Sequence, residues 1–201
     1  TTKLRRIDNF FTATGYLPND IWIQQMETSS KVYFDNEYVT ISQYGIGSIA
    51  AGQMEYDFDI TALGTLEIDE GKNYSETLPE ALTWIIGNDF IMSAQSVDIK
   101  LGESSADTGI LYVNRDLRLD TSAVNVDFNN AIVYVMGDMY INTNTTVSGG
   151  TKIYVAGDVH QNASFNGVLG TTCFVGGTLY DSYGNATAGG GLPTTAIDQA
   201  T

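Results

Sequence analysis

The sequence predicts an all-β fold, a β-solenoid in which short strands stack as successive coils. Apolar residues alternate with polar ones inside short segments, which is typical of half-buried strands. The segments between them are rich in Gly, Asn, Thr and Ser, the residues that form turns. A seven-residue pattern also recurs four times, as "LYVNRDL" from Leu111, "VYVMGDM" from Val133, "IYVAGDV" from Ile153 and "CFVGGTL" from Cys173.

The spacing of these repeats indicates the kind of repeat fold. Their starts lie 22, 20 and 20 residues apart, and a weaker repeat, "FIMSAQ" from Phe90, lies 22 residues before Tyr112. This period is too short for a βαβ unit and for most helical repeats, which need about 33 residues. It suits one coil of three short strands and three turns, with coils about 4.8 Å apart.

The alternation inside each repeat predicts which side chains point inward. We expect Val113, Val135, Val155 and Val175 to lie one above another as the solenoid core. Two more inward rows would flank them, namely Leu111, Val133, Ile153 and Cys173, and Leu117, Met139, Val159 and Leu179. Glycine at 137, 157 and 177 fits a bend with no room for a Cβ atom, so Arg115 predicts a different turn in its coil.

The chain outside the repeats is divided as follows. Residues 1–74 are predicted to be a β-rich docking region, either irregular first coils or a small β-sandwich. Residues 75–87 are predicted to cap the solenoid of residues 88–182 with a short helix at 78–86, because Thr77, Pro79 and Gly87 are helix start and stop signals. Residues 183–201 are predicted to be a flexible or extended arm.

Composition excludes several classes of function. The chain has 201 residues and a net charge of −15, with only nine Lys and Arg, so binding to nucleic acid is not expected. It has no run of 18 apolar residues, so we expect no membrane insertion. Its one cysteine, Cys173, allows no internal disulfide and lies in an inward row, which predicts a buried thiol.

The outward positions supply the candidate sites. Tyr112, Tyr134, Tyr154 and Phe174 would form a row that either binds a partner or glycan or only stabilises adjacent coils. A second outward row, Asp116, Asp138 and Asp158, follows at the turn. Such carboxylates could hold Ca²⁺ or act as a glycosidase pair, but aspartates at turns commonly bond to backbone N–H groups.

No catalytic set emerges from the chain. The only histidine, His160, is in line with Arg118, Tyr140 and Tyr180, and no nucleophile is aligned with it. The calcium-binding repeat signature is absent. We therefore expect no enzymatic activity, no metal and no cofactor.

The "[IV]-Y-V-x-G-D-apolar" coils at 132–139 and 152–159 resemble β-solenoid domains of phage fibres, spikes and capsid decoration proteins. They equally resemble solenoids of bacterial surface and pilus-associated proteins. The resemblance implies a non-enzymatic structural protein of a virion or cell surface, acting as a homo-oligomer or within a larger assembly. The alternatives are a secreted carbohydrate-binding adhesin or pilus subunit and a glycan-degrading tailspike. The opening residues lack a signal peptide's apolar core, which favours the virion.

Overall fold

The chain folds into three β-sheets. A computed structural model describes residues 4–6, 31–34, 37–41, 59–68, 81–93, 96–120 and 125–187. These residues form strands, turns and bends, and none of them is helical. The strands lie in two eight-stranded sheets and one three-stranded sheet, here called sheets A, B and C. The predicted all-β class is therefore confirmed.

Each sheet collects strands from along the chain. Sheet A contains, in spatial order, β1 (Leu4–Arg6), β2 (Lys31–Phe34), β4 (Asp59–Ala62), β6 (Thr83–Ile86), β9 (Gly109–Val113), β12 (Ala131–Val135), β15 (Lys152–Val155) and β17 (Cys173–Val175). Sheet B contains β3 (Tyr38–Ile41), β5 (Thr65–Ile68), β7 (Phe90–Met92), β10 (Leu117–Leu119), β13 (Met139–Ile141), β16 (Val159–Gln161), β18 (Leu179–Tyr180) and β19 (Ala186–Thr187). Sheet C contains β8 (Ser96–Lys100), β11 (Asn125–Asn129) and β14 (Asn144–Ser148).

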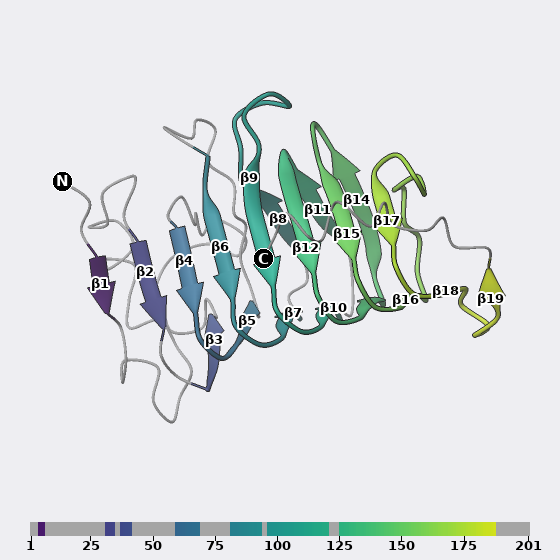
Figure 1. Cartoon of the computed structure of the whole chain (residues 1–201), viewed down its shortest axis with the longest axis horizontal. Helices are drawn as coiled ribbons and strands as arrows, with labels where there is room; N and C mark the ends of the chain where they lie inside the picture. The colour runs from purple at the N-terminus through teal and green to yellow at the C-terminus, as the bar shows by residue number, and fades with distance from the viewer. Residues whose placement is uncertain are drawn as a thin grey trace.

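The strands of each sheet are stacked in sequence order, with sheet A across the front, sheet B below it and sheet C behind (Figure 1). From β6 to β15 the chain passes from sheet A to sheet B and on to sheet C before it returns to sheet A. Each return to sheet A begins what is called a circuit here. Neighbouring circuits pair in parallel, apart from the last strand. This arrangement is compatible with the predicted β-solenoid.

The register places the four predicted valines in one row. Val135 pairs with Val113 on one side and with Val155 on the other, and Val155 pairs with Val175. Because these neighbours are parallel and in register, each of the four circuits presents an apolar side chain to the core at the same position as the circuit before it.

Earlier circuits are longer and less regular. Ile86 pairs with Val113 and Ala62 pairs with Ile86, and the partners in both pairs lie further apart in the sequence than those of the later circuits. The strands β1, β2 and β4 belong to sheet A, and β3 and β5 belong to sheet B, so the described strands before residue 74 extend the same two sheets. The two sheets run without interruption across the boundaries expected at residues 74 and 87.

The prediction of a capping helix over 78–86 is wrong for residues 83–86, which form β6 inside sheet A. Trp84 and Ile86 point into the core, whereas Ile85 between them is 42% exposed. This alternation has the period of a strand, and pairing on both sides with β4 and β9 overrides the helix-capping signals. The first part of the expected helix, residues 78–80, lies outside the described residues.

The alignment of the weakest repeat, "FIMSAQ" from Phe90, with the strand of Tyr112 is wrong by one strand. Phe90 pairs with Leu117 in sheet B, not with the Tyr112 row of sheet A. The strand that precedes Tyr112 in sheet A is β6, whose Ile85 is the partner of Tyr112. The segment "WIIGNDF" from Trp84 is therefore the true counterpart of "LYVNRDL".

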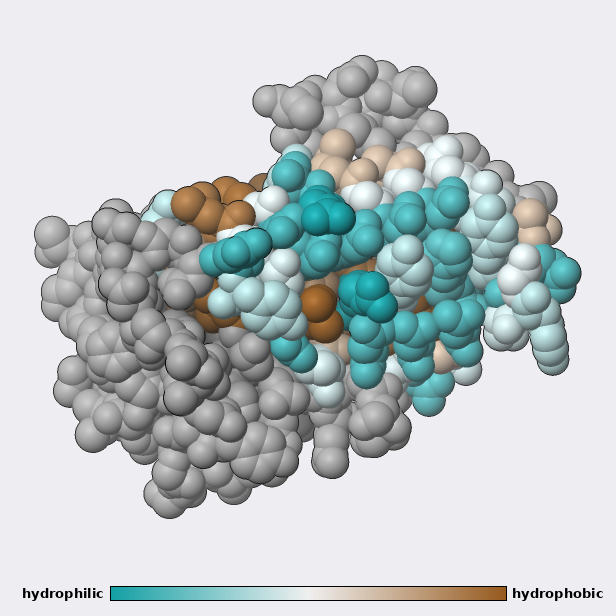
Figure 2. Space-filling view, turned by 90° about the horizontal axis from the view of Figure 1, so that it is seen from below, coloured by the Kyte–Doolittle hydropathy of each residue, from teal (hydrophilic) through white to brown (hydrophobic). Residues whose placement is uncertain are grey.

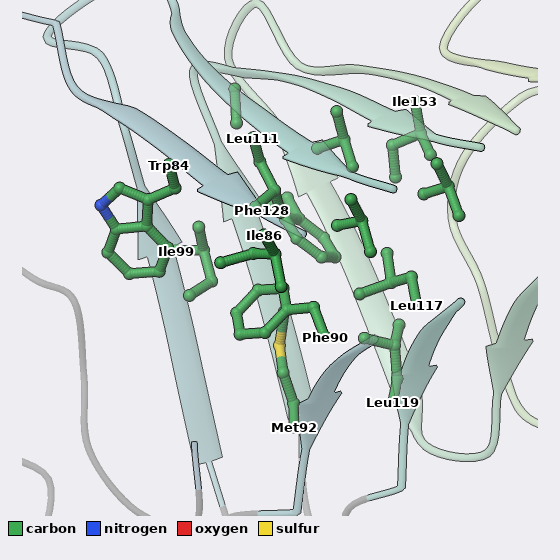
Figure 3. Packing of buried hydrophobic residues seen from close by; sticks show 14 of the residues in the cluster. Trp84, Ile86, Phe90, Met92, Ile99, Leu111, Leu117, Leu119, Phe128 and Ile153 are labelled. Carbon is green, nitrogen blue, oxygen red and sulfur yellow. The ribbon is translucent and has the colours of Figure 1, made fainter. Parts of the chain in front are cut away.

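The core is a continuous apolar stack enclosed by the three sheets (Figure 3). Val113, Val135, Val155 and Val175 are each at most 1% exposed. In the earlier circuits, which contain more residues, large rings pack in the core. Trp84 contacts Phe90 edge to face with ring centroids 6.2 Å apart. Cys173 ends one inward row, and burial raises the pKa of its thiol to about 12, as expected of a packed and unreactive side chain.

The last circuit is closed by the chain itself. The Cys173 carbonyl accepts a hydrogen bond from Gly170 N at 2.8 Å, and Cys173 N donates to the Val168 carbonyl, so the preceding loop covers this part of the edge of β17. In sheet B the edge of β18 is paired by β19, which is antiparallel. Residues 183–187 of the predicted arm thus complete a hairpin, and residues 188–201 lie outside the described residues.

Candidate functional site

The outward side of sheet A carries the predicted aromatic row. Tyr112, Tyr134, Tyr154 and Phe174 are neighbours on successive strands and are all half-buried. Ile85 continues the row on β6. A second outward row contains Ile110, Ile132 and Lys152. The outward residues of β6, β9, β12, β15 and β17 are called the sheet A face.

The rings of Tyr134, Tyr154 and Phe174 in this row are stacked face to face. The ring centroids of Tyr134 and Tyr154 are 5.4 Å apart with planes 15° from parallel, and those of Tyr154 and Phe174 are 4.8 Å and 10° apart. Burial raises the pKa of the Tyr134 hydroxyl, with a smaller contribution from Tyr154. A sugar ring stacks on the flat side of an aromatic ring, so Tyr154, which has a ring on each side, has only its edge left for contact.

A second stack follows the outward side of sheet B, along the predicted alignment of His160. The Tyr140 and His160 rings lie 4.8 Å apart, and the His160 and Tyr180 rings lie 5.0 Å apart. Arg118 extends the stack, because its guanidinium lies 5.0 Å from the centroid of Tyr140 while its Nε donates to Asp120. Seen from below, the described part of the molecule is mainly hydrophilic (Figure 2). His160 therefore serves as a stacked ring, with no nucleophile in this row.

The aspartate row joins neighbouring circuits by hydrogen bonds at the turn between sheets A and B. Oδ1 of Asp116 accepts a hydrogen bond from Asp138 N at 3.0 Å, and Oδ1 of Asp138 accepts one from Asp158 N at 2.8 Å. Asp158 accepts in the same way from Thr178 N at 2.7 Å. Each carboxylate thus uses one oxygen on the backbone of the next circuit, which is the structural alternative weighed for these residues.

Sequence reasoning missed the first member of this row. Oδ1 of Asp89 accepts from Asp116 N at 3.1 Å, one circuit earlier than the predicted row begins. The signal was present in "GNDF" from Gly87, which matches "GDM" and "NRDL" in the later repeats. It was hidden because the circuit between Asp89 and Asp116 is longer than the circuits that follow it.

The glycines of this turn leave space for the aspartates. A Cβ atom on Gly157 would lie 2.2 Å from Oδ1 of Asp138, and one on Gly137 would lie 2.3 Å from Oδ1 of Asp116. The turn at Arg115 was expected to differ, yet Arg115 N donates to Asn88 O just as Gly137 N donates to Arg115 O. The backbone ladder therefore runs through Arg115 without a break, and its guanidinium Nε lies 3.8 Å from Asp89.

Two further polar links join circuits at the other turns. Asn162 donates to Oδ1 of Asn142 at 2.8 Å, and Asn142 donates to Asp120. Asn130 is buried and has a positive φ of 49°. Its side-chain Nδ2 donates a hydrogen bond to Gly102 O, and its Oδ1 accepts one from Gly150 N. Nothing in the repeat pattern distinguishes Asn130 from the many turn asparagines, so sequence reasoning did not find it.

The ring stacks and the hydrogen-bonded polar rows form surfaces that a partner could contact, and they are not arranged as a catalytic or metal site. Within the described residues, no group of three His, Cys, Asp or Glu side chains is placed to hold a metal ion. The same part of the chain contains no helix with the length and apolarity to cross a membrane. No family model, curated protein or solved structure matches this chain.

The structural role of the aspartates can be tested at Asp138. We expect Asp138→Ala to lower the free energy of unfolding by about 1–2 kcal/mol, because Asp158 N loses its acceptor. Asp138→Asn keeps an oxygen in the same place and should stay close to the wild type. Urea denaturation followed by circular dichroism measures both. Equal losses in the two variants would show that charge, and not the backbone hydrogen bond, explains the aspartate.

Proposed function

We propose that this chain is a non-enzymatic structural protein of a virion, such as a phage fibre, spike or decoration protein, that acts by assembly and surface contact. The observation that supports this most is the parallel register of β9, β12, β15 and β17 in sheet A, which aligns Val113, Val135, Val155 and Val175 in one row. Such stacking makes a stiff β-solenoid that holds surface side chains at fixed spacing. A protein of this kind acts through its position in an assembly and through the surfaces that it contacts.

The described polar groups fit this proposal better than they fit catalysis. The aspartates that could have formed a glycosidase pair each have an oxygen bonded to backbone N–H, and the lone histidine is stacked between two tyrosines. The repeats resemble phage solenoids and bacterial surface solenoids equally, so the resemblance does not decide between a virion and a cell surface. That resemblance concerns the fold, so an experiment on location decides between them.

The location can be measured with an antibody raised against the folded chain. We expect immunogold labelling of phage particles released from a culture that expresses the gene, and an extracellular rather than cytosolic signal. Labelling of pili or the cell envelope in cultures that release no particles would favour the cell-surface alternative. A signal confined to the cytosol would contradict both.

Binding of a host glycan is a second proposal, and the geometry restricts where it can occur. Among the described residues, Phe174 is the last ring of its stack, and no described ring stacks on its side away from Tyr154. A Cβ atom built on Gly170, in the loop that bonds the Cys173 carbonyl, would meet no atom within 4 Å, which shows open space at this end. The exposed side chains of Val168 and Leu169 belong to the same loop.

The glycan proposal is tested on an array with two variants. Phe174→Ala removes the terminal ring and should abolish binding, whereas Tyr154→Phe keeps the middle ring and should leave binding unchanged. Binding that survives Phe174→Ala would exclude this end of the stack as the glycan site.

A further inference from the structure

The sheet A face differs in charge from the rest of the chain. The protein has 24 acidic and 9 basic residues, yet the outward positions of these five strands hold no carboxylate. They are Thr83, Ile85, Ile110, Tyr112, Ile132, Tyr134, Lys152, Tyr154 and Phe174. The aspartates lie at the turn beside this face and Asp59 lies on the adjoining strand β4, so a face whose one charged residue is Lys152 has an acidic border.

This face is also apolar and rigid. Ile85 is 42% exposed and Ile110 is 41% exposed, although both have β-branched apolar side chains. Stacking of Tyr134, Tyr154 and Phe174 fixes the rings in one orientation, and the backbone beneath them is paired on successive strands. A rigid face loses little side-chain entropy on contact, which lowers the cost of binding.

The charge distribution indicates which partner covers the face. Two copies with a net charge of −15 repel each other, and the repulsion is least where neither surface carries carboxylates. A basic partner would be attracted to the aspartate turn instead. Strand addition at the C-terminal end is hindered, because the loop at 168–172 and β19 cover edges of β17 and β18.

From these observations we propose that two copies of this chain pack with their sheet A faces together. The contact is an isologous one, in which the rows of one copy lie across the same rows of the other, as in packed β-sheets. This deepens the proposed structural function and rests on it, because it names the partner and the surface used in assembly.

The size of the face sets the expected strength. Five strands about 4.8 Å apart and three to five residues long, at about 3.3 Å each, give a footprint of about 330 Å² per copy. Stable interfaces bury about 800 Å² per partner, so the dimer should be weak and concentration-dependent. Because the copies repel through their net charge, added salt should strengthen the association.

Sedimentation velocity of the full chain over a concentration series tests the proposal. The wild type should shift from monomer towards dimer as concentration rises, and more so at about 0.5 M than at about 0.05 M salt, where screening differs most. Ile85→Lys with Ile110→Lys should weaken association at least tenfold by burying two ammonium groups at the contact. These lysines lower the net negative charge, so general repulsion cannot explain a loss.

Ile91→Lys is the matched control. Ile91 points outward on β7 of sheet B between Glu67 and Arg118, and its substitution should leave association unchanged. Circular dichroism checks that all variants remain folded. A monomer at every concentration and salt, or association unaffected by the double variant, would overturn this proposal. Particle labelling by the antibody would still support the structural function in that case, so the two proposals fail separately.

Discussion

The structure depends on the in-register hydrogen bonding of each circuit to the next. Parallel pairing aligns equivalent residues, so a side chain that fits in one circuit has an identical or similar neighbour above and below. The inward valines make the core, and the outward rings and aspartates make ladders along the surface. A residue that breaks the register in one circuit would displace every row at once, because side chains alternate between the two faces of a strand.

The polar turns reinforce this register. The aspartate row satisfies backbone N–H groups at one turn, and the amide of Asn130 links three circuits at another. These bonds explain why small residues recur beside the aspartates, since a Cβ at Gly137 or Gly157 would occupy the place of the carboxylate oxygen. The recurring "Gly-Asp" thus has a structural explanation in these turns.

Sequence reasoning was most successful where the period is constant. From Leu111 to Val175 the repeats are nearly equal in length, and the inward rows, the outward rings and the alignment of His160 with Tyr140 were all predictable. Before Leu111 the circuits lengthen, the motif loses its tyrosine, and β6 carries local helix signals. Pairing with strands distant in sequence decides that segment, because its local patterns contain both a strand alternation and helix-capping signals. The face-to-face stacking of the rings, which limits glycan contact, also follows only from the three-dimensional stack.

The register itself can be measured by disulfide formation. In a Cys173→Ser background, Tyr134→Cys with Tyr154→Cys places two thiols on paired residues, whose Cα atoms should be about 4.8 Å apart and within reach of a disulfide. Tyr112→Cys with Tyr154→Cys places them two circuits and about 9.6 Å apart, which is too far. After mild oxidation, mass spectrometry should find an intramolecular bond in the first pair and free thiols in the second. Free thiols in the first pair, or a bond in the second, would contradict the stacked register.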